Sequence, residues 1–268
     1  MDSGYWSAVS GSDAREQQLE IIANNMANIN TAGFKKDGVD FHTFIKNRDN
    51  PDPSNSVPRD LLALKQQYPL DGNESVGVVT KKTYTDQSQG ALEKTDDPFH
   101  LAINGPGFFQ VLAPDGIKLS RAGNFQIRRD GLLCTIHGYP VLKEGSSEQF
   151  DYNGILNSRA VRVDGRFSVG GDGTVNIGGA NQGKLALVLP ANNDLLQKVG
   201  LSLYETKSPL AVAPGSISQG FLEKSNVNAV QELSEMLRVN RAFEAGQKVI
   251  KTFDALNSRS VNEISKIN

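Results

Sequence analysis

The sequence contains a single cysteine, Cys134, among its 268 residues. One cysteine excludes an internal disulfide and any metal site built from several thiolates. Cys134 stands in LLCTI, a stretch typical of a strand, so we interpret it as a small buried residue rather than a reactive thiol. Aromatic residues make up only 7% of the chain, with one tryptophan, Trp6. Few aromatic rings are therefore present to stack on a sugar or a nucleobase.

Charge of one sign and long apolar runs are also missing. The formal net charge is -2, with acids and bases interspersed, so we expect no binding of nucleic acid. The longest apolar run, LALVLPA at 185–191, is too short for a transmembrane segment. The first residues, MDSGYWSAVSGSDAREQQ, lack the basic and apolar regions of an ordinary secretory signal. Composition by itself favours a cytoplasmic protein, on the assumption that no signal-less export route operates.

The common catalytic patterns are absent as well. NGPGFF lacks the third glycine of a dinucleotide-binding loop and is better interpreted as a tight turn. There is no P-loop and no G-x-S-x-G motif, and DGRFSVGGDGTV misses the ligand spacing of an EF-hand. The three histidines, His42, His100 and His137, are far apart and lie in no metal-binding motif. We therefore predict a protein that is not an enzyme and holds no cofactor or metal.

Both ends of the chain have helical periodicity. Leu19, Ile22, Met26 and Ile29 follow a 3-4-3 spacing, which predicts a helix over residues 3–30 that ends near Gly33. A second helix is predicted from 227 to about 264, roughly 55 Å long, with Asn228 at its N-cap. Its two stripes are Leu233, Met236, Asn240, Phe243, Gln247, Ile250 and Val239, Ala242, Gly246, Val249, Phe253, Leu256. Narrow stripes sustained this long predict a coiled-coil-like seam, and the nearest partner is the N-terminal helix.

The middle of the chain has a different pattern. From about 75 to 217, short runs rich in Val, Ile, Leu and Phe alternate with turn signals, including Asp-Gly at 115–116, 130–131, 164–165 and 172–173. We find no helical period there and predict an all-β domain. Residues 46–60 contain three prolines and many polar side chains, which indicates an extended connector, followed by a short helix at 60–67.

These patterns predict an α+β protein in four parts. Residues 1–35 form the N-terminal helix of an inner helical domain and 36–87 an extended arm. Residues 88–222 form one all-β outer domain, and 223–268 return as the C-terminal helix of the inner domain.

Three stretches resemble the signatures of the flagellar rod and hook axial proteins. The first, IIANNMANINTAGFKK at 21–36, carries the resemblance on Ile22, Ala23, Asn24, Asn25, Met26, Ala27, Asn28, Thr31, Gly33, Phe34 and Lys35. The second is SQGALEKTDDPFHLAINGPGFFQV at 88–111, which continues into LSRAGNFQIRRDGLLCTIHGYPVL. The third is GFLEKSNVNAVQELSEMLRVNRAFEAGQKVI at 220–250. The resemblance covers both ends and much of the middle, in the family's order.

The resemblance implies a self-assembling subunit of the bacterial flagellar basal-body rod, which crosses the periplasm as an axial drive shaft. It also implies export by the flagellar type III apparatus without a cleaved signal. The chain has room for only one β domain, so it is more similar to a rod protein than to a hook protein. Between rod proteins we favour the proximal F-type over the distal G-type, because FHTFI and NESVGVV fit the G-type elements poorly. His100 and Ser120 replace the usual aspartate and threonine without threatening the fold.

We predict that assembly uses side chains of both terminal helices. The predicted subunit interface is Leu19, Ile22, Asn24, Asn25, Met26, Asn28, Ile29, Leu233, Met236, Asn240, Phe243, Ile250 and Phe253. Asparagine disfavours helix but can fix the register of a helix seam, which explains Asn24, Asn25 and Asn28, whereas Asn30 is expected to help end the helix. Gly33, Phe34 and Lys35 are expected to anchor the turn into the arm.

The implied partners are other copies of the chain, other rod proteins and the export apparatus, with the surrounding ring proteins or peptidoglycan as further candidates. A β-rich peptidoglycan-binding module is the alternative function, weakened by the scarcity of aromatic residues. An enzyme whose catalytic cluster converges from distant loops is a third.

Overall fold

The computed structural model describes residues 2–47, 57–58, 74–145, 151–192 and 195–264. The chain forms two compact units. Unit 1 comprises Met1–Ala27, Lys36–Asp86 and Val227–Asn268, and unit 2 comprises Asn28–Lys35 and Gln87–Asn226. The chain therefore passes from one unit to the other four times, and residues 28–35 belong to unit 2 rather than to the N-terminal helix with which the sequence analysis groups them.

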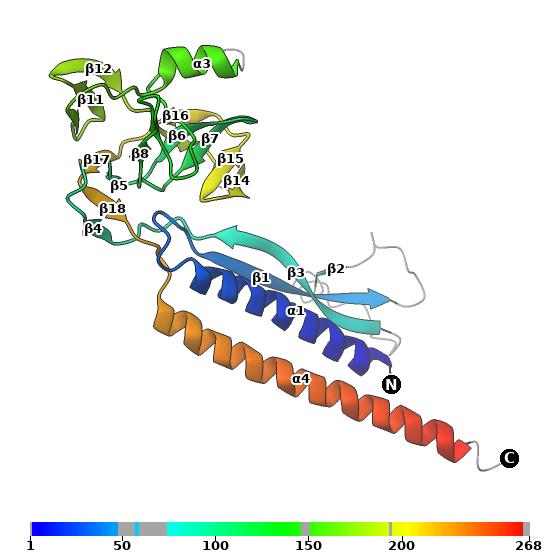
Figure 1. The fold of residues 1–268 in the computed structure, drawn as a ribbon. Helices are drawn as coiled ribbons and strands as arrows, with labels where there is room; N and C mark the ends of the chain where they lie inside the picture. Colours follow the sequence, from blue (N-terminus) through cyan, green and yellow to red (C-terminus); the bar gives the residue numbers. More distant parts are fainter. Residues whose placement is uncertain (1, 48–56, 59–73, 146–150, 193–194, 265–268) are drawn as a thin grey trace. The chain divides into compact units, whose positions relative to one another are not determined.

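Two helices form much of unit 1: α1, Asp2–Ala27, and α4, Ala229–Ile264 (Figure 1). Both were predicted from their apolar periodicity, and their observed limits confirm the prediction to within a few residues. The Oδ1 atom of Asn228 accepts hydrogen bonds from the backbone amides of Val230 (3.0 Å) and Gln231 (3.3 Å). These amides have no partner inside the helix, so Asn228 starts α4 as a true N-cap.

The remaining elements of unit 1 are a β-hairpin with a short added strand. β1 (Asp37–Asn47) pairs antiparallel with β3 (Glu74–Thr85), and β2 (Val57–Pro58) pairs with β1. The described parts of 36–87 are therefore largely a hairpin, not the extended connector that the sequence predicts. Each strand finds its partner far along the chain, so the pattern of either strand alone does not reveal the pairing. The helix predicted at 60–67 lies outside the described residues.

Helix α1 packs along strand β3 within unit 1 (Figure 1). Ser10 Oγ accepts a hydrogen bond from the backbone amide of Val78 at 3.1 Å, and Thr80 Oγ1 donates to Gln17 Oε1. A strand edge with free amides can pair with another chain. The side chain of Ser10 satisfies one amide of β3.

Unit 2 is rich in strands. They are β4 (Leu92–Lys94), β5 (Leu101–Asn104), β6 (Phe108–Ala113), β7 (Gly116–Ser120), β8 (Gln126–Ile127), β9 (Leu133–Cys134), β10 (Phe167–Val169), β11 (Thr174–Ile177), β12 (Ala180–Lys184), β13 (Leu187–Pro190), β14 (Leu196–Gly200), β15 (Leu203–Thr206), β16 (Leu210–Val212), β17 (Ser216–Gln219) and β18 (Phe221–Glu223). Six of them form an antiparallel sheet in the order β14-β15-β7-β6-β13-β16, and a smaller sheet has the order β10-β11-β12. The predicted Asp-Gly turns at 115–116 and 172–173 connect β6 to β7 and β10 to β11.

The core of unit 2 lies between these strands. Phe109, Val111 and Leu133 are fully buried, and the ring of Phe109 packs edge-on against Phe125 with centroids 5.2 Å apart. Such an aromatic pair adds to the free energy gained by burying apolar area.

The prediction of an all-β region is wrong at one place, because residues Tyr152–Arg159 form helix α3. The side chain of Asp151 caps its first turn by accepting from the amides of Asn153 (3.2 Å) and Gly154 (3.1 Å). Ile155 is buried and packs with Leu112 and Leu142. α3 has 8 residues, of which Ile155 is the one buried apolar residue. Such a short helix gives no clear helical periodicity of apolar residues in the sequence.

Candidate functional site

The two helices of unit 1 contact each other along an antiparallel seam. The rings of Tyr5 and Phe253 lie 6.4 Å apart, and Gln18 Nε2 donates to Glu235 Oε1 at 3.0 Å. Residue numbers thus rise along α1 while they fall along α4. The α4 side chains that face this seam are wholly or partly buried and follow 3-4 spacing: Glu232, Met236, Val239, Phe243, Ile250 and Phe253.

The helices approach closely at Ser12 and Gly246. A Cβ atom added to Gly246 would lie 2.7 Å from Ser12 Oγ, so glycine allows the contact. Ser12 is 5% exposed, and its hydroxyl has no hydrogen-bond partner among the residues that the structure describes. Small residues at this point let the two backbones approach each other.

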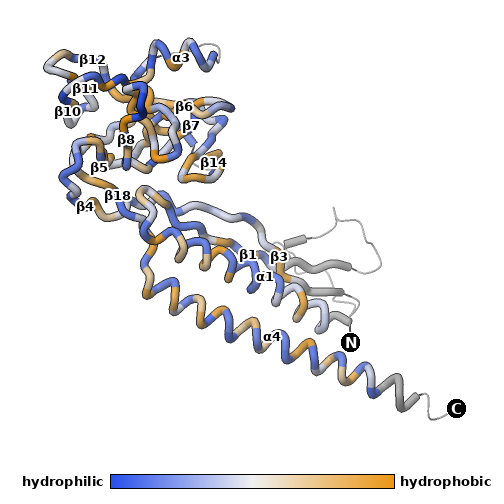
Figure 2. The backbone as a smooth tube through the Cα atoms, in the orientation of Figure 1, coloured by the Kyte–Doolittle hydropathy of each residue, from blue (hydrophilic) through white to orange (hydrophobic). Residues whose placement is uncertain are grey.

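The other side of α4 carries large apolar side chains in solvent. Figure 2 shows hydrophobic and hydrophilic residues alternating along the coloured part of the helix. The exposed apolar residues are Val230 (74%), Leu233 (48%), Leu237 (53%), Val249 (45%) and Leu256 (48%). We call these five residues the α4 outer stripe. Val230, Leu233 and Leu237 are 3 and 4 residues apart and share one face of α4, whereas Val249 and Leu256, 7 residues apart, begin 12 residues further on and lie on a neighbouring face.

Asn25 has a different role from the subunit contact that the sequence predicts. Its side chain is 1% exposed, donates to the carbonyl of Asp37 at 2.8 Å and accepts from the amide of Asp37 at 2.9 Å. It also donates to Glu232 of α4 at 3.4 Å, and Glu232 pairs with Lys36 at 2.6 Å. The asparagine amide thus satisfies both backbone groups of the first residue of β1. This contact holds the hairpin to α1 inside one subunit.

The other predicted interface residues differ in burial. Ile22 is 4% exposed and belongs to the interior of unit 1. Asn24, Leu233 and Asn240 are exposed, whereas the half-buried ones are Leu19, Met26, Asn28, Ile29, Met236, Phe243, Ile250 and Phe253.

The predicted turn anchors enter unit 2. Gly33 has φ +66° and donates its amide to the carbonyl of Glu223 at 2.8 Å. A Cβ atom at Gly33 would lie 2.4 Å from the backbone of Ala122, so only glycine fits. Phe34 is buried, and Lys198 Nζ lies 4.2 Å from the centroid of its ring.

Lys35 completes this anchor through a buried ion cluster. Lys35 Nζ lies 2.5 Å from Glu223 Oε1, and Arg121 Nε lies 2.6 Å from Glu223 Oε2. Their side chains are 1%, 5% and 1% exposed for Lys35, Arg121 and Glu223. The amide of Gly90 also donates to Glu223, at 2.9 Å, and Arg121 donates to the carbonyls of Ile103, Gly105 and Gly107. Such saturation with hydrogen bonds is what permits charges in an interior.

Sequence reasoning identified Lys35 as an anchor but missed Arg121 and Glu223. The sequence did hold a weak signal for both residues, because each is a charged residue near apolar ones. Arg121 stands in LSRAGNF and Glu223 in GFLEKSN. A buried carboxylate next to two cations needs three distant segments to meet, which no local pattern shows.

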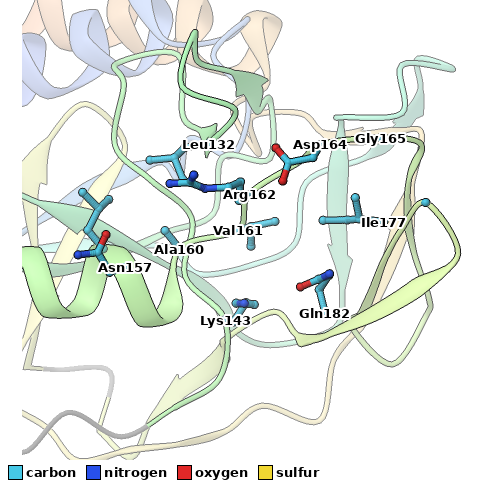
Figure 3. A pocket seen from close by; sticks show the side chains of 12 residues that line it. Leu132, Lys143, Asn157, Ala160, Val161, Arg162, Asp164, Gly165, Ile177 and Gln182 are labelled. Carbon is cyan, nitrogen blue, oxygen red and sulfur yellow. The ribbon is translucent and has the colours of Figure 1, made fainter.

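Unit 2 also has an open cavity of about 400 Å³ between α3 and the β10–β12 sheet. Figure 3 shows Lys143, Asp164 and Gln182 around the apolar side chains of Val161 and Ile177. The residues that line it include no serine, histidine or cysteine, so it holds no nucleophile and base of the kind that hydrolases use.

Across the described ranges, no group of three or more His, Cys, Asp or Glu side chains is placed to hold a metal ion. Cys134 is fully buried, and burial raises the pKa of its thiol to about 11. None of the described helices combines the length and apolar character needed to cross a bilayer.

Three family profiles match the chain. "Flagella basal body rod protein" matches residues 7–35, "Flagellar hook protein FlgE/F/G D1 domain" matches 102–177, and "Flagellar basal body rod FlgEFG protein C-terminal" matches 218–263. The first and last matches fall on the terminal helices and the middle one on unit 2.

Curated relatives match over nearly the whole chain. The flagellar basal-body rod protein FlgG of Buchnera aphidicola subsp. Schizaphis graminum is 34% identical over 96% of this chain and 97% of its own length. FlgG of Bacillus subtilis is 30% identical over 96% and 97%. FlgF of Caulobacter vibrioides is 31% identical over the full length of both chains.

Paired terminal helices and a mostly β central region define an α+β structural protein. The chain belongs to the flagellar basal-body rod proteins of the F and G type. It is a structural component of the rod in the basal body, not an enzyme, and works together with other rod proteins.

Proposed function

We propose that this rod subunit assembles through its terminal helices, with α1 and α4 forming a coiled-coil-like inner layer and unit 2 an outer domain. The α4 outer stripe is the observation that carries the proposal. Large apolar side chains that remain in solvent on one side of a packed helix mark surfaces for another protein. The 3 and 4 residue spacings of Val230, Leu233 and Leu237 suit a second helix at this part of the stripe.

The lengths of the helices support the same proposal. α4 has 36 residues and α1 has 26, so α1 cannot cover α4 along its whole length. The seam with α1 uses one side of α4 and leaves the outer stripe for a neighbouring subunit.

We keep the accessible residues of the predicted interface as subunit contacts. They are Leu19, Asn24, Met26, Asn28, Ile29, Leu233, Met236, Asn240, Phe243, Ile250 and Phe253. Ile22 and Asn25 are left out because both are buried inside unit 1. The chain is anchored in unit 2 by residues 33–35. The amide of Gly33 donates to the carbonyl of Glu223, Phe34 is buried, and Lys35 forms an ion pair with Glu223.

We assign the chain to the proximal F-type, with the distal G-type as the alternative. FHTFI and NESVGVV fit the elements of G-type proteins poorly. Relatives named FlgF and FlgG match at similar identity, so a position in the rod must come from experiment. A tag on this chain, located by cryo-electron tomography of basal bodies, separates the two: density at the cell-proximal end supports the F-type and density at the distal end the G-type.

Export by the flagellar type III apparatus is part of the same proposal. Its support is the resemblance of the chain to subunits that leave the cell without a cleaved signal. Deleting the export ATPase or gate should leave the chain inside the cell, and its continued appearance outside would count against this route.

The assembly proposal is tested in cells that lack the native gene. Leu233→Glu with Leu237→Glu places two charges on the outer stripe, and we expect loss of swimming and basal bodies with missing or short rods. Ser234→Glu is the matched control, because it puts the same side chain on an exposed polar position between them. Circular dichroism of each purified variant checks that α4 is retained. Normal rods in the double variant would refute the role of the stripe.

A further inference from the structure

Unit 1 has an exposed tryptophan near one end of α1 and a cavity near the other end. Trp6 is 58% exposed. The cavity has a volume of about 330 Å³ and is formed by the last turns of α1, the first turns of α4 and the hairpin; its walls include Ile21, Ile22, Val39, Tyr84, Gln231 and Glu235. Residues 6 and 21 of one helix are roughly 22 Å apart, so the two features cannot meet within one subunit. We call them the Trp6 knob and the α1–α4 socket.

The knob is held by packed aromatic rings. Trp6 packs edge-on to Tyr5 at 6.3 Å, and Tyr5 packs edge-on to Phe253 of α4 at 6.4 Å. Neighbouring rings therefore restrict the indole before any partner binds, which lowers the entropy cost of docking. A rigid, exposed tryptophan is the side chain that most often dominates the binding free energy of an interface.

The socket offers suitable surfaces for an indole ring. Ile21, Ile22 and Val39 provide apolar wall, and Tyr84, which is 54% exposed, provides an aromatic one. The ring of Tyr84 lies against Gly38, where a Cβ atom would be only 2.5 Å from it. Gln231 and Glu235 supply oxygen acceptors for an indole N–H. The volume of the α1–α4 socket lies at the lower end of the roughly 300–1,000 Å³ typical of ligand pockets.

The charges at the two ends are complementary. The socket is lined by three acids and one base: Asp37, Glu232, Glu235 and Lys36. At the knob end, α1 residues 4–12 carry no charge, and α4 residues 248–259 carry three bases and one acid: Lys248, Lys251, Arg259 and Asp254. An acidic end and a basic end on one unit favour contact between unlike ends of two copies.

We propose that the Trp6 knob of one copy docks into the α1–α4 socket of a second copy, head to tail. The proposal rests on the assembly function proposed above and specifies one contact of it. Such a contact is heterologous: each added copy leaves a free knob at one end and a free socket at the other. Addition can then continue along one axis, as a rod requires.

A disulfide test uses two variants of the full chain, Ser7→Cys and Gln231→Cys; residue 7 is next to Trp6 on α1, so the indole is retained. The native Cys134 is fully buried and stays out of the reaction. Each variant carries one introduced cysteine besides the buried Cys134, so a bond between positions 7 and 231 can form only between two chains. Under mild oxidation the mixed variants should give a covalent dimer at least tenfold above either variant alone. Ser7→Cys mixed with Glu244→Cys, an exposed α4 position outside the socket, is the matched control.

The contribution of the indole is measured by self-association in analytical ultracentrifugation. Trp6→Ala should weaken association roughly 30-fold or more, as for a hot-spot tryptophan, and Trp6→Phe should recover much of it. Val212→Ala, which removes an exposed apolar side chain of unit 2, should change little.

Several results overturn the docking proposal. A dimer of Ser7→Cys with itself would indicate a two-fold contact, and cross-linking in cells to a different rod protein would replace the second copy as partner. Absence of the mixed dimer, or of any self-association at high concentration, also refutes it. The assembly proposal has its own test, which is whether rods form in cells with Leu233→Glu and Leu237→Glu. Loss of rods in that variant would support assembly through α4 even if the Trp6 knob does not bind the socket.

Discussion

Lys35 and Glu223 lie 188 positions apart in the sequence and form an ion pair of 2.5 Å in the interior of unit 2. Arg121 shares the same carboxylate. The pair joins the segment by which the chain first enters unit 2 to the last strand before it leaves.

Removing the charge of this carboxylate should destabilise the protein strongly. In Glu223→Gln, Lys35 and Arg121 stay buried without an anionic partner, and we expect a loss of about 3–5 kcal/mol in the free energy of unfolding. Urea unfolding of the full chain measures it. Lys224→Met is the matched control, because the neighbouring Lys224–Glu93 pair (2.9 Å) is exposed and should contribute less than about 1 kcal/mol. Equal stability of the two variants would contradict a structural role for the buried cluster.

Asn25 gives a second prediction. Asn25→Leu removes the two hydrogen bonds that the buried Asn25 side chain makes with the backbone of Asp37, at about 1 kcal/mol for each. We expect a lower midpoint in urea unfolding before any assembly is examined. Asn24→Leu, at the adjacent exposed position, should leave the midpoint nearly unchanged and affect only assembly. If Asn25→Leu has the same urea midpoint as the wild type, the contacts of Asn25 with Asp37 do not stabilise unit 1. The predicted role of Asn25 as a subunit contact would then be favoured.

Gly33 tests the turn into unit 2. Gly33→Ala combines a left-handed backbone with a collision against the backbone of Ala122, and we expect a loss of roughly 3 kcal/mol in thermal unfolding. Gly178→Ala is the matched control. Gly178 has a similar φ of +59° but open space around its Cβ position, so it should lose only roughly 1–2 kcal/mol. Similar losses at both positions would mean that the close approach at Gly33 does not matter.

Cys134 gives a prediction with a defined pH dependence. With its pKa raised to about 11, roughly one thiol in a thousand is ionised at pH 8, against about a quarter for an ordinary cysteine. Burial also blocks access, so the native chain should react with iodoacetamide far more slowly than the urea-unfolded chain. Raising the pH from 8 to 9 should increase the small native rate about tenfold if the residual reaction occurs in the folded state. Fast labelling at neutral pH would show that the thiol is accessible.

Much of the α+β organisation could be predicted from the sequence. The two terminal helices have long apolar periods, and Asn228 is a local capping signal that acts within three residues. The Asp-Gly turn between β6 and β7 is equally local. Helices, caps and tight turns depend on residues that are close in the sequence, so sequence patterns predict them well.

The errors concern contacts between distant residues. The β1–β3 hairpin joins strands on both sides of the Pro-rich stretch, whose composition led to the prediction of an extended arm. Asn25 was interpreted by its helix position alone, while its partner Asp37 lies beyond the turn. Arg121 and Glu223 had no visible reason to be buried until β18 and residues 33–35 were placed together. Such roles depend on tertiary structure and leave little trace in local composition.

The fourfold passage of the chain between the units has a mechanical consequence. Two units joined by a single peptide connection depend on that connection alone for any force passed between them. Here the load divides among four peptide connections, after residues 27, 35, 86 and 226. One broken connection leaves three intact, so the two units of a subunit stay attached under tension that would separate a pair joined by one tether.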